Sequence, residues 1–167
     1  MNHSHKNYLQ MAVIALSLLL GLSIAISGQA DAIPVEIAQE DGRFQLLRGG
    51  KPYAVRGAGL EVGDIGLFAS HGGNSIRTWS TENPKITALE VLDNAEKHGV
   101  TVSMCIEVGR ERLGFDYNDE EAVAAQFEFA RNEVMKYKDH PALLTWIIGN
   151  EVNLSFRNPK VFDAIND

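Results

Sequence analysis

The feature that most constrains the fold is an alternation of two patterns after residue 52. Short apolar runs, which suggest strands, are separated by longer segments in which apolar residues recur at helical spacing. The runs are Tyr53–Ala58, Asn74–Trp79, Val100–Gly109 and "ALLTWIIGN" at residues 142–150. Because such runs suit strands buried on both faces, they favour a parallel sheet covered by helices through right-handed crossovers. The predicted fold class is therefore α/β, with about four parallel strands.

Three segments carry helix signals. The first begins after Asn83-Pro84 and ends before Gly99, and its apolar face holds Ile86, Leu89, Leu92 and Ala95. The second follows a capping box predicted at Asn118 and Glu121, and its apolar face holds Val123, Phe127, Ala130, Val134 and Tyr137. Asn158-Pro159 repeats the start signal near the end of the sequence. Each segment is therefore predicted to cover the sheet with one apolar face.

The stretch "FQLLRGGKPYAVRGAG" predicts a β-hairpin before the first parallel strand. Gly49-Gly50 is a pair that readily takes the positive φ angles of a tight turn, and the second arm is Tyr53–Ala58. Two architectures fit the alternating segments after this hairpin, an open doubly wound sheet or part of a closed (β/α)₈ barrel. The glycine-rich dinucleotide fingerprint of the first is incomplete, because Val62 stands where its third glycine belongs. A partial barrel is therefore favoured.

Residues 1–32 are predicted to direct export. Met11–Ile26 is an uncharged run that is short for a membrane span, and small residues follow at Ala30 and Ala32. A cleaved signal peptide is the preferred interpretation, and a membrane anchor through residues 11–26 is the alternative. Either one places the domain at residues 33–167 in a periplasmic or extracellular compartment.

Composition excludes several partners. The net charge is -7, from 22 acidic and 15 basic residues without a basic stripe, so nucleic acid is not expected to bind. Cys105 is the single cysteine and is predicted to be a small buried hydrophobe. His71 and His140 lack partners at ligand spacing, so neither a metal nor another cofactor is expected.

The fourth apolar run ends on Asn150 and Glu151. In a parallel barrel, the carboxyl ends of the strands meet at one mouth, where the active sites of that fold lie. A carboxylate there, partly desolvated by Trp146 and other aromatic residues, suits a general acid. Asn150 suits a hydrogen bond to a sugar hydroxyl. From the residues alone, a structural ion pair or a solvated loop charge explains Glu151 equally well.

Four segments, in order, resemble the catalytic barrel of glycoside hydrolase family 2, in the clan of retaining enzymes that includes β-galactosidases and β-glucuronidases. They are "FQLLRGGKPYAVRGAG", "GGNSIRTWS", "VGRERLGFDYND" and "HPALLTWIIGNEVN", which together span Phe44 to Asn153. The resemblance implies hydrolysis of O-glycosidic bonds in oligo- or polysaccharides, with Glu151 as the general acid/base. It also implies that Asn150 contacts the sugar 2-hydroxyl and that Arg77 orients the nucleophile.

Other interpretations of the neighbouring residues stay open. Arg77 could pair with a nearby carboxylate instead. Trp79 is as well explained by the core as by stacking on a sugar ring, whereas Trp146 is predicted to lie in the core. Glu107 and Glu111 are predicted to be loop charges paired with Arg110 and Arg112.

The retaining mechanism needs a second carboxylate, which the resemblance assigns to a seventh strand. A complete barrel takes about 250 residues, so residues 33–167 are expected to form its N-terminal half. This half is expected to be inactive alone and to require the missing half as a partner. An exported carbohydrate-binding module, a transglycosylase relative and an inert fragment are the alternatives.

Overall fold

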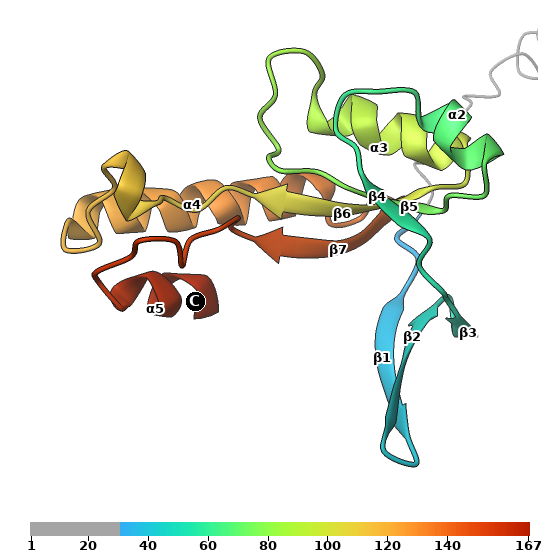
Figure 1. Cartoon of the computed structure of the whole chain (residues 1–167), viewed down its shortest axis with the longest axis horizontal. Coiled ribbons are helices and arrows are strands. Elements are labelled where there is room, and N and C mark those ends of the chain that lie inside the picture. The colour runs from blue at the N-terminus through green and yellow to red at the C-terminus, as the bar shows by residue number, and fades with distance from the viewer. Residues whose placement is uncertain (1–30) are drawn as a thin grey trace, which may run out of the picture.

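The computed structural model describes residues 31–167 and contains two sheets (Figure 1). An antiparallel three-stranded sheet comes first in the chain. A four-stranded parallel sheet alternating with helices comes second. The α/β prediction is therefore confirmed. The predicted signal or anchor at Met11–Ile26 lies outside the described residues, and no helix within residues 31–167 is long and apolar enough to cross a membrane.

The antiparallel sheet consists of β1 (Val35–Glu40), β2 (Arg43–Arg48) and β3 (Lys51–Pro52), paired in that order. Both of its turns have positive φ at two successive residues, at Asp41-Gly42 (49° and 73°) and at Gly49-Gly50 (58° and 71°). These angles suit the right-handed twist of a two-residue hairpin. The predicted turn at Gly49-Gly50 is confirmed. The predicted second arm, Tyr53–Ala58, was wrong, because β2 pairs with Lys51–Pro52. β1 was not predicted.

The parallel sheet contains β4 (Gly57–Gly59), β5 (Ser75–Arg77), β6 (Thr101–Ile106) and β7 (Leu143–Ile148). Each strand pairs in parallel with the next strand along the chain, so the spatial order is β4-β5-β6-β7. A doubly wound sheet reverses its strand order at a switch point. The unbroken order seen here is instead that of successive βα units in a barrel.

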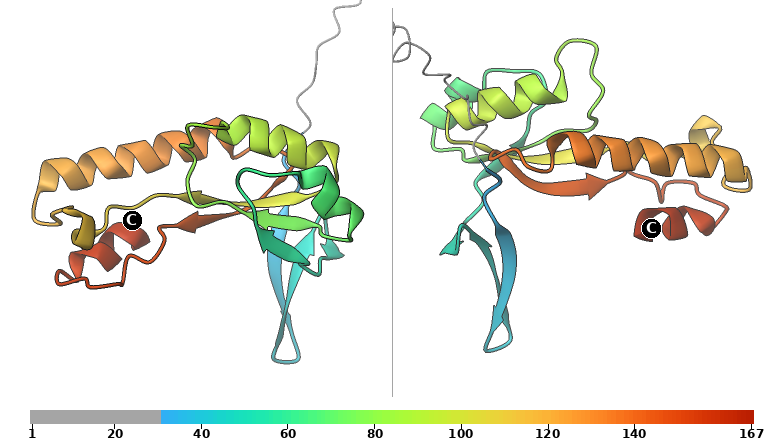
Figure 2. Two further views of the ribbon diagram at one scale, coloured as in Figure 1. Left: turned by 45° about the horizontal axis from the view of Figure 1, so that its top comes forward. Right: turned by 180° about the vertical axis from the view of Figure 1, so that it is seen from behind.

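The helices are α2 (Ile65–Ser70), α3 (Ala88–Lys97), α4 (Glu120–Tyr137) and α5 (Lys160–Asn166), with a short 3₁₀ turn η1 (Glu111–Leu113). Figure 2 (left) shows α3 and α4 along one side of the parallel strands, with the hairpin projecting away from them. Two predicted helix starts were wrong. Thr87, not Asn83, caps α3 in a capping box with Glu90, and Asp119, not Asn118, caps α4 by accepting from the Ala122 N–H.

The core lies between the parallel strands and α3. Ile76, Val102 and Met104 point outward from the sheet against Val91, Leu92 and Ala95, and all six are buried. Trp146 packs against the same cluster, as predicted. The predicted face of α3 was partly wrong, because Leu89 is 44% exposed whereas Val91 is buried.

The other face of the sheet carries small polar side chains and one arginine. Arg77, Ser103 and Thr145 occupy one row across β5, β6 and β7, and Ser75 and Thr101 form a row below them. At the amino-terminal ends of the strands, the Tyr53 hydroxyl donates to Asn74 O (2.7 Å) and lies 3.1 Å from Thr101 Oγ1. The hairpin therefore contacts the bottom of the sheet and leaves the carboxyl ends free.

A groove of about 950 Å³ separates α4 from β7 and α5. Its lining includes four of the five residues of the predicted apolar face of α4, of which Val123, Ala130 and Val134 are half-buried and Phe127 is 43% exposed. The fifth, Tyr137, packs against the core cluster. Ile148, at the end of β7, faces the same groove. The helix α4 was thus predicted correctly, but among the described residues its predicted apolar face is only partly covered and Phe127 is exposed.

Candidate active site

The carboxyl ends of β4 to β7 meet at one edge of the parallel sheet. The residues that follow these ends include Glu61 after β4, Trp79 after β5, Glu107 after β6 and Asn150-Glu151 after β7. Parallel pairing in unbroken order brings these four loops together, although they come from segments far apart in the sequence. We call this edge the rim.

Arg77 and Asn150 are in direct contact at the rim. The Arg77 guanidinium donates to Asn150 Oδ1 at 2.6 Å, across the end of β6 that separates their strands. Because this oxygen accepts from Arg77, the amide is oriented with its Nδ2 donors available for another acceptor. Burial raises the pKa of the Cys105 thiol, which lies close enough to Arg77 for the guanidinium to oppose the shift.

Glu151 lies at the rim in a different environment from the one expected. Its backbone is left-handed, with φ of 52°, and its side chain is 57% exposed. Arg112 donates to both the backbone oxygen of Glu151 and its Oε2, the latter at 3.0 Å. Trp146 does not desolvate the carboxylate, since its ring packs against the α3 core. The position of Glu151 at the strand end is as predicted, but its surroundings are solvent and a guanidinium.

Trp79 is half-exposed at the rim and lies over β4. A Cβ added at Gly59 would come within 2.8 Å of Trp79 Cη2, so only glycine leaves room for the indole ring. The ring is 42% exposed. Trp79 therefore has an accessible aromatic surface. It follows Arg77 by two residues in the chain.

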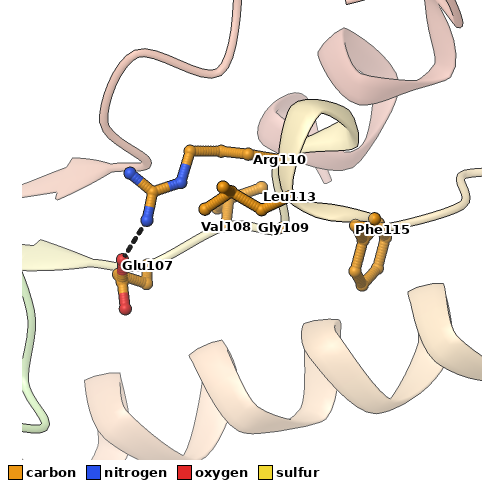
Figure 3. Close-up of a pocket in the computed structure, with 7 residues that line it drawn as sticks. Glu107, Val108, Gly109, Arg110, Leu113 and Phe115 are labelled. Carbon is orange, nitrogen blue, oxygen red and sulfur yellow. Dashed lines mark hydrogen bonds and ion pairs between the residues drawn. The ribbon is translucent and has the colours of Figure 1, made fainter.

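The loop after β6 borders a pocket of about 400 Å³ (Figure 3). Glu107 pairs with Arg110 at 2.8 Å, as predicted. The predicted pairing of Glu111 with Arg112 was wrong, because Arg112 contacts Glu151. The Glu111 carboxylate instead accepts from the backbone N–H groups of Arg157 and Asn158, and these bonds lower its pKa. This loop thus joins β6 to the segment that follows Glu151.

Glu61 was not singled out from the sequence. It follows the end of β4 by two residues, and its Oε1 is buried without a hydrogen-bond partner among the described residues. The signal that could have found it is the one used for Glu151, a carboxylate directly after an apolar strand.

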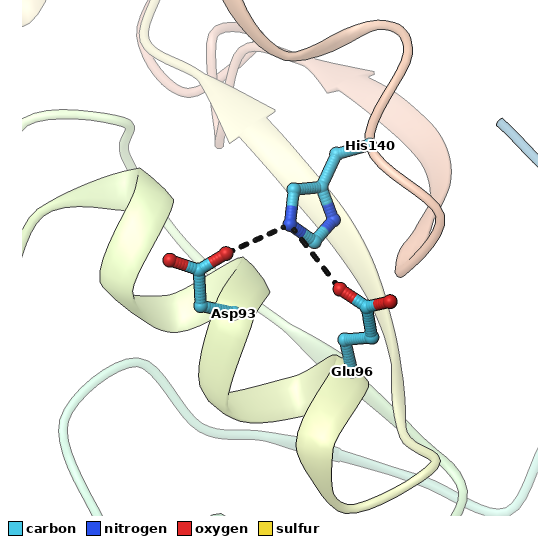
Figure 4. Close-up of side chains that lie close together, drawn as sticks. All are labelled: Asp93, Glu96 and His140. Carbon is cyan, nitrogen blue, oxygen red and sulfur yellow. Dashed lines mark hydrogen bonds and ion pairs between the residues drawn. The ribbon is translucent and has the colours of Figure 1, made fainter. Parts of the chain in front are cut away.

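His140 has partners that its sequence spacing did not reveal. Its Nε2 lies 3.1 Å from Asp93 Oδ1 and 3.9 Å from Glu96 Oε2, and the ring is buried (Figure 4). The Ala142 N–H donates to Nδ1 at 3.1 Å, so Nδ1 is an acceptor and the Nε2–H donates a hydrogen bond to Asp93 Oδ1. A histidine that binds metal through Nε2 normally donates from Nδ1. The cluster therefore fits a structural hydrogen bond better than a metal site.

Comparison with known proteins finds no matching family model and no matching curated protein.

Proposed function

We propose that the rim is a carbohydrate site and that the full-length form hydrolyses O-glycosidic bonds in oligo- or polysaccharides by a retaining mechanism. Glu151 is the general acid/base, and Asn150, Arg77 and Trp79 bind the sugar. The observation that carries the proposal is the Arg77–Asn150 hydrogen bond of 2.6 Å, next to Glu151. It joins the ends of two strands that the resemblance to glycoside hydrolase family 2 had assigned to the same site.

Each residue type suits the chemistry proposed for it. As the glycosidic C–O bond breaks, a carboxylic acid at Glu151 donates its proton to the leaving oxygen. The Nδ2 donors of Asn150 suit a sugar hydroxyl, because Oδ1 is already engaged by Arg77. The exposed face of Trp79 suits stacking on the apolar face of a pyranose ring.

The second carboxylate of this mechanism belongs to the other half of the barrel, which is the proposed partner of this chain. A retaining site places its two carboxyl groups about 5 to 5.5 Å apart, and the resemblance assigns the nucleophile to a later strand. The chain alone is therefore proposed to bind sugars without hydrolysing them. The pattern of residues 1–32 supports an exported protein, either secreted or anchored.

Calorimetry with a panel of β-linked tetrasaccharides of glucose, xylose, mannose and galactose tests this proposal. At least one is expected to bind the natural chain, and binding is expected to weaken about tenfold or more in Asn150→Ala, which loses the amide donors. Phe44→Ala, an exposed residue of the hairpin strand β2, is the control and should bind normally. Failure of every glycan to bind the folded chain would contradict a carbohydrate site.

A carbohydrate-binding module without catalysis is the second candidate. It is favoured by the exposed Trp79 ring and by the engagement of Glu151 with Arg112. A chromogenic β-glycoside panel with the complete barrel separates the two functions. Turnover that disappears in Glu151→Gln supports the hydrolase, whereas binding lost in Trp79→Ala without any turnover supports the module.

A further inference from the structure

Four buried polar side-chain atoms have no hydrogen-bond partner among residues 31–167, and two of them lie within two residues of a strand end at the rim. These two are Glu61 Oε1, just after β4, and Arg77 Nε, at the end of β5. A buried carboxylate oxygen or guanidinium N–H without a partner costs more free energy than most hydrogen bonds contribute. Such atoms therefore point to a group that completes them, either water or a ligand.

The two residues follow strands that pair directly, with Gly59 of β4 opposite Arg77 of β5. Burial raises the pKa of the Cys105 thiol, Arg77 opposes this shift and Glu61 adds to it. The rim thus holds an acceptor and a donor on neighbouring loops, beside the Arg77–Asn150 contact and the ring of Trp79.

This combination selects for a particular chemistry. The carboxylate needs a donor and the guanidinium N–H needs an acceptor. A hydroxyl group is both at once, so a sugar presents what these two atoms lack. A carboxylate or phosphate ligand would satisfy Arg77 but would be repelled by Glu61.

We propose that Glu61 is a further substrate-binding residue, which accepts a hydrogen bond from a hydroxyl of a neutral sugar held at the rim. It adds a contact from β4 to those proposed from β5 and β7. This inference rests on the proposed function, because it requires that the rim binds carbohydrate.

The test compares the natural chain with Glu61→Gln by calorimetry, using the tightest-binding tetrasaccharide of the panel. Glutamine keeps the shape of the side chain but replaces one oxygen by an amide, so affinity is expected to fall about tenfold to a hundredfold. Glu128→Gln, an exposed residue of α4, is the control and should bind as the natural chain does. Circular dichroism verifies that each variant is folded.

Deoxy analogues of the same sugar give an independent readout. Removing the hydroxyl that contacts Glu61 should weaken binding to the natural chain but have little further effect on Glu61→Gln, as in a double-mutant cycle. If Glu61→Gln binds as tightly as the natural chain while Asn150→Ala does not, water completes the carboxylate and this proposal is wrong. If no glycan binds the natural chain, the proposed function itself is wrong.

Discussion

Arg112 holds Glu151 through two hydrogen bonds, one to its backbone oxygen and one to its carboxylate at 3.0 Å. The arginine comes from the loop after β6 and the glutamate follows β7. Glu151 has a φ of 52°, a conformation that costs a non-glycine residue free energy and needs support from its surroundings. Arg112 therefore fixes the proposed acid/base in both position and backbone conformation.

Replacing Arg112 by alanine is expected to loosen the segment after β7 more than to unfold the protein. The pair is partly exposed, so its loss should lower the free energy of unfolding by no more than about 1 kcal/mol. Hydrogen exchange should nevertheless become faster at residues 151–154. Arg110→Ala, which removes only the pair with Glu107, is the control. Unchanged exchange at residues 151–154 in Arg112→Ala would show that Glu151 is held by other contacts.

Acid should release the loop after Glu151 from η1. Glu111 accepts from the N–H groups of Arg157 and Asn158, which lowers its pKa below the ordinary value of 4.5. Since the folded-state pKa is the lower one, the stabilisation is complete above pH 4.5 and is lost as the pH falls through the folded-state value. Amide exchange at residues 157 and 158, corrected for intrinsic rates, should report this loss. Glu111→Gln should remove the pH dependence, and its persistence in that variant would implicate another group.

Gly59→Ala should displace Trp79 from the rim. The added Cβ would lie 2.8 Å from the indole ring, closer than real Cβ contacts, so the ring must move. Tryptophan fluorescence is expected to change and glycan affinity to fall. Gly72→Ala has open space around its Cβ but a strained φ of 85°, so it shows the effect of a glycine replacement in which no side chain has to move. An unaltered spectrum and affinity in Gly59→Ala would place the indole elsewhere.

Two leucines of α3 test which face of this helix is buried. Leu92 is fully buried in the core, so Leu92→Ala should cost about 2–5 kcal/mol. Leu89 is 44% exposed, and Leu89→Ala should cost about 1 kcal/mol or less. Urea unfolding measures both. Equal costs would contradict the described orientation of α3.

The fold was predictable because its parallel strands are buried runs with clear helical segments between them. The elements that escaped prediction lack such patterns. β1 belongs to an exposed hairpin, so its apolar side chains are not buried on one face. Ile37, for example, is 65% exposed. The predicted starts of α3 and α4 were wrong. The capping residues Thr87 and Asp119 lie closer to the first helical turn than Asn83 and Asn118 do.

The rim was predictable only in outline. Arg77, Asn150 and Glu151 lie at one edge of the sheet because the carboxyl ends of parallel strands meet there. Their environments depend on residues far away in the sequence. Arg112 stands 39 positions before Glu151 and Asn150 stands 73 positions after Arg77. No local periodicity encodes such contacts, so the expected desolvation of Glu151 by Trp146 and the pairing of Glu111 with Arg112 were both wrong.

Azide rescue most directly tests whether Glu151 donates a proton to a glycosidic oxygen. Azide attacks the anomeric carbon in place of the absent carboxylate, the C–O bond breaks, and the leaving oxygen takes the proton of Glu151. With an aryl glycoside that has a poor leaving group, the azide-dependent rate of phenol release should fall about 100-fold or more in Glu151→Gln. A dinitrophenyl glycoside, which needs no acid, should be cleaved equally by both proteins. Release from the poor leaving group that is azide-dependent and equally fast in both proteins would contradict the proposed role of Glu151.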